Sequence, residues 1–363
     1  MPACEFAGCR APRAAKQGDR VKAAIIEKFG ALTVQQIPVP EPGDYDALCE
    51  LLYGATCTGT DSHIIDGNFP WISPLPTVLG HESVGRVVSV GRKVRNFRVG
   101  DLVTRVGMPG TPDGKISVTW GGFAEMGLAR DHWAMCADGR PAAEWAGSRW
   151  NQIVPTAVDP KVAPMFTTWR ETLSYITRMG FSTGSSVLVV GSGGNGLSYA
   201  AHAANLGAAC VAMAGSARLE AGAKAKAGVK LYFDYKRGDL TEAIGKAYPD
   251  GFDFIIDAVG QAGVADRVLP CLKAGGKYGT YGIDDFGKIT INPGRARGAI
   301  TVHPCSYDEA ETHQRVSEFV LQGKLDASLW YDLAHPCPLQ EIDAAFDAVR
   351  SRKSPKVLVQ LRA

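Results

Sequence analysis

The chain has 363 residues, 45% of them hydrophobic, and a formal net charge of +2. This length is typical of about two domains, and the nearly balanced charge argues against nucleic acid and charged membrane surfaces as partners. No apolar run reaches the ~18 residues of a membrane-spanning helix. None of the nine cysteines forms a C-x-x-C pair, so neither a disulfide framework nor a zinc ribbon is expected. The simplest compartment for such a protein is the reducing cytoplasm.

The first part of the chain predicts an appendage followed by a β-rich domain. Residues 1–20 hold two cysteines and four basic side chains but lack the apolar stretch of a secretory signal. We expect them to lie outside the fold, with Val21 as the natural start. A strand follows at 21–26, and short β-like segments such as 47–53, 83–90 and 101–105 alternate with turns. This pattern is typical of a barrel-like domain.

The second part predicts alternating strands and helices. Strands are expected at 187–190, 210–214, 252–257, 277–281 and 300–303. Such alternation indicates a doubly wound parallel sheet, so the fold class is α/β. Two helices, at 308–322 and 339–351, and a last strand at 356–361 complete the chain.

A glycine turn follows the first of these strands. Gly191, Gly193 and Gly196 fit G-x-G-x-x-G directly after an apolar run and before an Ala-rich helix. The first glycine allows a tight turn, the second lets the backbone approach a pyrophosphate, and the third lets helix and strand pack closely. The turn therefore predicts a dinucleotide site. The alternative is a glycine-rich turn that binds nothing.

Five further segments occur in an order that resembles a known family. They read Cys-Thr-Gly-Thr-Asp-Ser-His at 57–63, Gly-His-Glu at 80–82, Val-Gly-Asp-Leu-Val at 99–103, Trp-Gly-Gly-Phe-Ala-Glu at 120–125 and Asp-Ala-Val-Gly at 257–260. With the glycine turn, they resemble the medium-chain dehydrogenase/reductase superfamily. Within it, the chain is similar to the zinc-dependent polyol (sorbitol), glucose and threonine dehydrogenases.

This resemblance implies a division of the chain. It places a GroES-like catalytic domain at 21–168, a Rossmann NAD(P)-binding domain at 169–303, and a C-terminal return to the catalytic domain at 304–363, after the extension at 1–20. It implies an active site between the domains, a small polar alcohol or ketone as substrate, and a homodimer or homotetramer.

The resemblance also implies roles for the residues at 57–82. Cys57, His81 and Glu82 would hold a zinc ion, which acts as a Lewis acid on the alcohol. Asp61 would orient His81. Thr60 would bond the substrate oxygen and His63 would pass the proton to solvent.

Two positions depart from the family pattern. The usual ligand cysteine falls at Thr58 here, so Cys57 reaches the metal only if the chain bulges by one residue. The third protein ligand of the family falls at Thr167, a poor zinc ligand, while Glu171 lies one helical turn further on. If both are true losses, the site has no zinc. Trp71, Trp120 and Trp169 are either pocket or core residues.

The end of the second strand of the Rossmann part indicates the nucleotide. NAD sites usually have an acidic residue there, but this chain has Ala214, followed by Ser216 and Arg218, which suit a 2′-phosphate. NADP is therefore favoured over NAD, unless Arg218 is simply an exposed helix residue. The other residues expected at the cofactor are Gly191, Gly193, Gly194, Asn195, Gly196 and Val259.

The combined prediction is a zinc-dependent, NADP-preferring alcohol dehydrogenase or carbonyl reductase. Its substrate would be a polyol, a sugar or another polar secondary alcohol. A zinc-free enone or quinone reductase on the same scaffold is the first alternative. A nucleotide-binding protein without turnover is the second.

Overall fold

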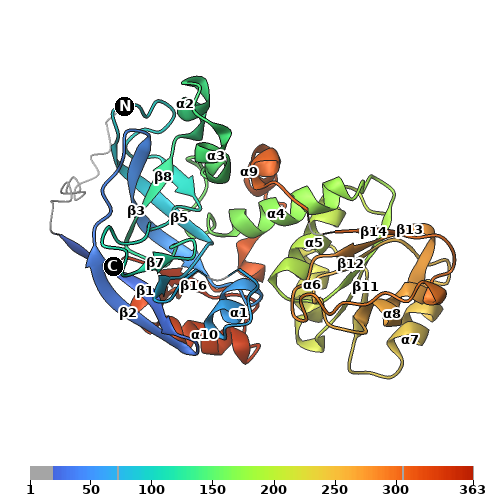
Figure 1. Ribbon diagram of the computed structural model, residues 1–363. Helices are drawn as coiled ribbons and strands as arrows, with labels where there is room; N and C mark the ends of the chain where they lie inside the picture. Colours follow the sequence, from blue (N-terminus) through green and yellow to red (C-terminus); the bar gives the residue numbers. More distant parts are fainter. Residues whose placement is uncertain (1–18, 72, 305, 363) are drawn as a thin grey trace, which may run out of the picture.

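The computed structural model describes residues 19–71, 73–304 and 306–362 (Figure 1). Residues 1–18 of the predicted appendage lie outside the described residues. The first strand, β1 (Arg20–Lys28), contains the expected strand at 21–26.

Two sheets form the β-rich part. The first, in the order β2-β1-β4-β7, adds β2 (Ala31–Pro38), β4 (Thr77–Val78) and β7 (Ser117–Val118) to β1. The second, in the order β15-β16-β3-β5-β6 with β8 also on β3, contains β3 (Asp46–Ala55), β5 (Ser83–Val90), β6 (Leu102–Thr104), β8 (Met126–Arg130), β15 (Cys337–Pro338) and β16 (Leu358–Gln360). The register of β3 against β5 shifts twice. Such bulges bend strands, as a barrel-like sheet requires.

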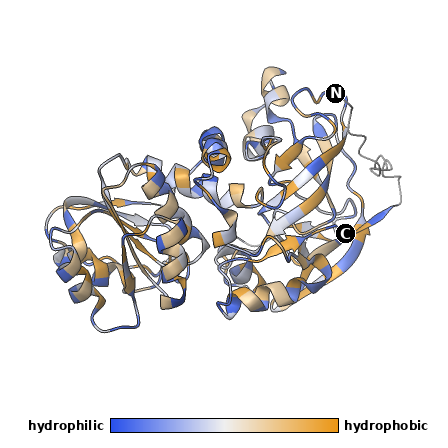
Figure 2. Cartoon of the chain, turned by 180° about the vertical axis from the view of Figure 1, so that it is seen from behind, coloured by the Kyte–Doolittle hydropathy of each residue, from blue (hydrophilic) through white to orange (hydrophobic). Residues whose placement is uncertain are grey.

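Short helices surround these sheets. They are α1 (Thr60–Ile65), α2 (His132–Ala137), α3 (Ala142–Trp145) and α10 (Ile342–Arg350). A buried apolar core joins the strands to α1 and α10, and hydrophobic residues concentrate inside this part (Figure 2).

The remaining strands form one parallel sheet in the order β11-β10-β9-β12-β13-β14. The strands are β9 (Ser186–Val190), β10 (Cys210–Gly215), β11 (Leu231–Asp234), β12 (Phe252–Asp257), β13 (Leu272–Thr280) and β14 (Thr301–His303). This is the strand order of a Rossmann fold. The predicted α/β class, with a GroES-like part and a Rossmann sheet, is confirmed.

Both faces of the parallel sheet are covered. The helices are α4 (Met165–Arg178), α5 (Gly194–Asn205), α6 (Glu220–Lys226), α7 (Leu240–Ala247), α8 (Val264–Val268) and α9 (His313–Leu321). Val187 and Val189 of β9 join the core with α4 and α5, while Leu188 and Val190 join the core with α7 and α8. Alternate residues of one strand thus face opposite helical layers, which explains the continuous apolar run.

The two parts are joined by more than one connection. Helix α4 lies between them (Figure 1), and β16 near the C-terminus pairs antiparallel with β3 of the first part. The domain boundaries at 168/169 and 303/304 stay predictions, and the first of them falls inside α4.

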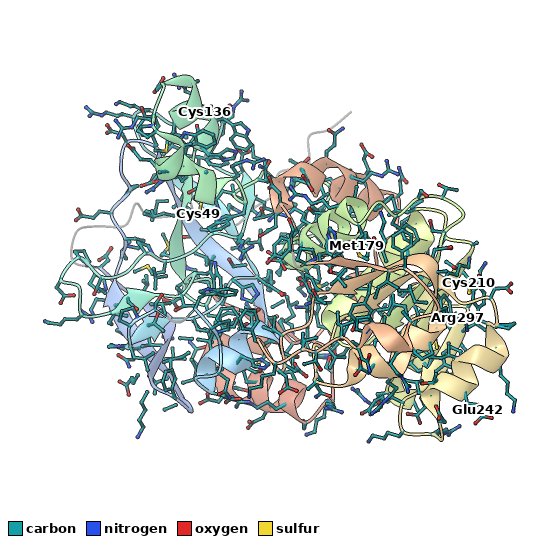
Figure 3. All side chains as sticks on the ribbon, turned by 45° about the vertical axis from the view of Figure 1, so that its right-hand side comes forward. Cys49, Cys136, Met179, Cys210, Glu242 and Arg297 are labelled. Carbon is teal, nitrogen blue, oxygen red and sulfur yellow. The ribbon has the colours of Figure 1, made fainter. Side chains whose placement is uncertain are left out.

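The cysteines of the described residues are free, as the sequence pattern predicts. They are Cys49, Cys57, Cys136, Cys210, Cys271 and Cys337. Figure 3 shows Cys49 and Cys136 in the β-rich part and Cys210 in the other. Among the helices of the described chain, none combines the length and apolar character needed to cross a membrane.

Candidate active site

A cavity of about 800 Å³ lies between the two parts of the molecule. Cys57, Thr60 and His81 line it from the β-rich side, and Asn195 and Val259 line it from the Rossmann side. The sequence motifs from both halves of the chain therefore meet in one space.

The turn before α1 brings Cys57 to this cavity. Asp61 holds the turn, because its Oδ2 accepts a hydrogen bond of 3.0 Å from the Cys57 amide. The Thr60 amide lies 3.4 Å from the Cys57 Sγ and donates to it. Thr58 is exposed instead and contacts the Pro355 carbonyl. Of the two neighbours, it is Cys57 that reaches the site.

His81 is fixed by the backbone before it and by a carboxylate beside it. Gly80 has φ +103°, and a Cβ there would lie 2.6 Å from Phe123, so only glycine fits. The His81 Nδ1 donates to Asp61 Oδ1 over 3.0 Å, and Nε2 lies 3.7 Å from Glu82 Oε1, on the side of the other possible ligands. Burial lowers the pKa of His81, but Asp61 and Cys57 together raise it well above its usual value. The environment of the His81 ring therefore favours a positive charge at this position.

Glu82 has a buried partner that the sequence did not reveal. The Lys356 Nζ lies 2.6 and 2.7 Å from the two carboxylate oxygens, and Thr168 Oγ1 donates to one of them over 2.9 Å. Lys356 is only 2% exposed. Burial lowers the pKa of Lys356, but Glu82 outweighs it and raises the value. The sequence feature that could have revealed this partner is a lysine directly before the apolar segment 357–361.

Three potential metal ligands meet within this arrangement. One donor atom each of Cys57, His81 and Glu82 lie within 4.8 Å of one another, and all three residues are buried. We call them the candidate zinc cluster. Thiolate, imidazole and carboxylate are the donors that catalytic zinc sites use, with a fourth position left for water or substrate. The residues therefore fit a zinc ion, and the cavity leaves room for that fourth position.

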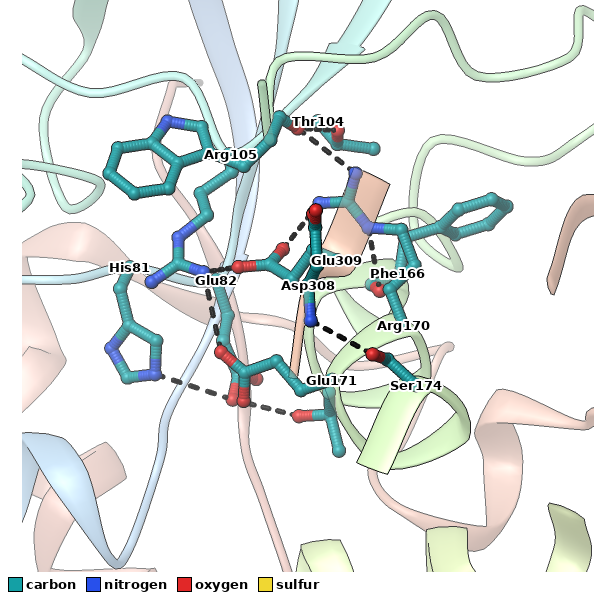
Figure 4. Close-up of polar contacts among 12 residues, drawn as sticks. His81, Glu82, Thr104, Arg105, Phe166, Arg170, Glu171, Ser174, Asp308 and Glu309 are labelled. Atoms are coloured by element: carbon teal, nitrogen blue, oxygen red, sulfur yellow. Dashed lines mark hydrogen bonds and ion pairs between the residues drawn. The ribbon is translucent and has the colours of Figure 1, made fainter. Parts of the chain in front are cut away.

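The alternative ligand positions on α4 do not join the cluster. Thr167 is buried, and its hydroxyl has no hydrogen-bond partner among the described residues. Glu171 instead contacts Arg105 over 3.3 Å (Figure 4). It also accepts a hydrogen bond of 3.1 Å from the Tyr281 hydroxyl. The suggestion that Glu171 reaches the metal finds no support in this contact pattern.

The predicted proton relay begins at the cavity wall. Thr60 lines the cavity, and His63 follows three residues later on α1, with its Nδ1 bonded to the Gly59 carbonyl. Burial raises the pKa of Asp284, and the electrostatic interaction with His63 opposes that rise. The roles of Thr60 and His63 stay predictions.

The glycine turn has the geometry that a pyrophosphate requires. Gly191 has φ +104° and packs against Val259, and a Cβ at Gly196 would lie 1.9 Å from the Gly191 carbonyl oxygen. A Cβ at Gly193, by contrast, would meet nothing within 4 Å. The turn is tight on the protein side and open at the N-terminus of α5, next to Gly194, where an anion is stabilised.

Strand β10 ends without an acidic residue. Ala214 is buried, and β10 continues to Gly215. The Ser216 amide donates to Ser192 Oγ over 3.0 Å. Arg218 is exposed and its Nη1 donates to the Lys353 carbonyl over 2.5 Å. The predicted roles of Ser216 and Arg218 stay predictions.

The Asp61–His81 bond gives a first testable expectation. Replacing Asp61 by asparagine should weaken zinc affinity by about 10–100-fold, because partners that orient a metal-binding histidine typically contribute that much. Competition with a chelator measures the affinity. The isosteric side chain keeps the turn, and an affinity equal to that of the wild type would show that Asp61 does not support the metal.

Comparisons with known proteins agree with this geometry. Residues 43–138 match the family model for the alcohol dehydrogenase GroES-like domain, and residues 194–321 match that for zinc-binding dehydrogenase. L-threonine 3-dehydrogenase from Shewanella woodyi is 27% identical over 343 residues, covering 89% of this chain and 94% of that protein.

Solved structures show the same fold. A protein of Sinorhizobium meliloti 1021, solved with NADP bound, has a TM-score of 0.76 at 26% identity, covering 94% of this chain and 99% of that one. Benzyl alcohol dehydrogenase from Acinetobacter calcoaceticus has a TM-score of 0.80 at 20% identity, covering 95% and 100%.

The matched segments, the parallel sheet and the candidate zinc cluster agree with one another. The predicted family resemblance and enzyme class are both confirmed. The chain belongs to the medium-chain, zinc-containing dehydrogenase/reductase superfamily and is an NAD(P)-dependent oxidoreductase that acts on CH–OH groups.

Proposed function

We propose that this enzyme transfers hydride between NADP(H) and a polar secondary alcohol or ketone, with zinc held by Cys57, His81 and Glu82. The observation that carries the proposal is the candidate zinc cluster at the wall of the cavity that Asn195 and Val259 also line. With its pyrophosphate at the glycine turn, the cofactor would extend its nicotinamide into the cavity, next to an alcohol bound there.

Zinc, when bound, supplies a Lewis acid that favours the alkoxide form of the alcohol. The chain's own residues supply the proton path and the orientation. In this proposal, Thr60 Oγ1 would accept the hydroxyl proton and His63 would pass it to solvent. Asp61 keeps the His81 ring in one orientation, and Lys356 balances the charge of Glu82.

The basic side chains after β10 support NADP as the cofactor. Arg218 lies beside the segment that carries Arg352 and Lys353, and all three side chains are exposed. A 2′-phosphate would meet positive charge here, and neither Ala214 nor Gly215 carries a carboxylate to repel it.

Replacing Arg218 by alanine should therefore raise the Kd for NADPH by about 10–100-fold, the equivalent of one or two charge-assisted hydrogen bonds. Fluorescence titration measures the Kd for NADPH and for NADH. The Kd for NADH should change little, because NADH lacks the phosphate. Equal losses for both nucleotides would reject a phosphate role for Arg218.

The proposal is tested by oxidation of a panel of polyols, sugars and simple secondary alcohols with NADP⁺ and NAD⁺. We expect turnover with NADP⁺. Reduction of enones or quinones without any alcohol oxidation would replace the proposal with the zinc-free reductase, which the buried Thr167 would then explain. Binding of NADPH without any turnover would indicate a non-catalytic protein. The dimer or tetramer expected for the family stays a prediction.

A further inference from the structure

Arg105 occupies an unusual position in the cavity wall. It follows β6 and has φ +54°, in the left-handed region that side chains other than glycine rarely adopt. The surroundings enforce this backbone: the Asn151 side-chain amide donates to the carbonyls of Thr104 and Arg105 over 3.1 and 3.0 Å, and the Arg105 amide donates to the Ser83 carbonyl over 2.7 Å. A strained backbone of this kind persists where surrounding contacts hold it in place, and such positions are often found at ligand sites.

The Arg105 side chain lies on the same aromatic wall as the candidate zinc cluster. Its guanidinium carbon lies 4.7 Å from the ring centre of Trp150 and 5.8 Å from that of Trp120. The Trp120 ring also lies 5.3 Å from the His81 ring, and Trp120 itself has φ +63°. Arg105, Trp120 and His81 all line the cavity. Trp71 lines it too, whereas Trp169 is fully buried in the core against Trp330.

One side of the guanidinium is already bound to protein. Glu171 and Glu309 both contact Nη1, and Glu309 also binds Arg170 over 2.7 Å (Figure 4). Two arginines therefore face two glutamates, and the group is balanced in charge. We call these four residues the arginine–glutamate cluster. A ligand that approaches Arg105 thus meets no net negative charge from this cluster.

The other side of the guanidinium carries a donor that is unpaired among the described residues. The Nε of Arg105 is buried and has no hydrogen-bond partner within the described residues, although the side chain is only 8% exposed. Both glutamates make their ion pairs at Nη1, whereas the opposite edge of the guanidinium is formed by Nε and Nη2. An unpaired buried donor is costly. That edge presents two parallel N–H groups, which match the two oxygens of a carboxylate.

From this geometry we infer that the substrate is a hydroxy acid, whose carboxylate binds the Nε–Nη2 edge of Arg105 while its hydroxyl lies at the candidate zinc cluster. The inference rests on the proposed function and names its substrate class. In the reaction, the carbinol carbon loses a hydride to nicotinamide C4 and the hydroxyl loses its proton. The products are the keto acid, NADPH and a proton.

Comparison of each acid with its uncharged ester tests this inference. The probes are 2- and 3-hydroxybutyrate and their methyl esters, each oxidised with NADP⁺. For at least one of the two pairs, the wild type should prefer the acid over the ester by about tenfold or more in kcat/KM, as a charge-assisted bidentate contact implies. Equal or better use of the ester in both pairs would overturn the inference.

Variants locate the effect at Arg105. Arg105→Gln should lower the acid-to-ester ratio by about tenfold, mainly through KM for the acid. Because this change leaves two buried glutamates short of a counter-ion, the double variant Arg105→Gln, Glu171→Gln is measured beside it and should show the same fall. Arg140→Gln, at an exposed ion pair with Glu144, serves as the control. An unchanged ratio in both Arg105 variants would overturn the inference.

Binding without turnover separates this inference from the proposed function. Titration calorimetry compares butyrate with butanamide, neither of which has a hydroxyl to oxidise. We expect the wild type to bind butyrate more tightly and the Arg105 variants to lose that preference. If the enzyme oxidises no alcohol yet shows this pattern, the proposed function fails and the carboxylate site stands. If neutral alcohols are oxidised but the wild type has no preference for butyrate, only the carboxylate site fails.

Discussion

Replacing His81 by alanine is expected to remove zinc and alcohol oxidation together. His81 is one of three donors in the candidate zinc cluster, and the pair that would remain, Cys57 and Glu82, is too few for a stable catalytic site. A Lewis acid contributes several kcal/mol to stabilising the charge that develops, so kcat/KM should fall by about 10³-fold or more. Metal analysis and steady-state kinetics on the same preparation measure both effects.

The exposed His335 provides a matched control. It pairs with Asp332 at the surface, and its side chain is 85% exposed. His335→Ala should keep both metal and activity. If His81→Ala lost its metal but still oxidised alcohols at the rate of the wild type, zinc would have no catalytic role and the mechanism proposed here would be wrong.

The second large effect is expected at Lys356. Replacing it by methionine removes the counter-ion of Glu82, whose carboxylate is 2% exposed. Breaking a buried ion pair on one side leaves an uncompensated charge, which typically costs about 3–5 kcal/mol. We expect a decrease of this size in the free energy of unfolding of the zinc-free enzyme, measured by urea denaturation.

Two further variants assign the cause of that loss. Lys356→Met combined with Glu82→Gln removes both charges and should recover much of the stability, because no unpaired ion remains. Lys353→Met changes an exposed lysine in the same segment and should have little effect. If the double variant were as unstable as the single one, packing around Lys356 rather than its charge would hold the structure together.

Apolar periodicity predicted the strands of the core well. The expected strands at 83–90 and 252–257 have the bounds of β5 (Ser83–Val90) and β12 (Phe252–Asp257). A short apolar run bounded by turn residues is typical of a buried strand, which is why these bounds could be predicted. The strand β11 (Leu231–Asp234) was not predicted. It is short, at the edge of the sheet and half-buried, so its hydrophobic signal is weak.

The candidate site was predictable only where its residues are close in the sequence or belong to a family motif. Cys57 and Asp61 are four residues apart, and their contact follows from the turn before α1. Lys356 and Glu82 are 274 positions apart, and the local sequence around either residue does not indicate that the two form a pair. Arg105 was missed for the same reason: its role depends on α4 and on a turn near Glu309.

The most direct test of the central claim is the zinc content of the enzyme, measured by elemental analysis after purification without a metal-affinity step. We predict about one zinc per chain, lost in His81→Ala, because the described part of the chain gathers one set of catalytic-type ligands at the cavity. Protein that binds NADPH but contains no zinc, even after incubation with the metal, would contradict it.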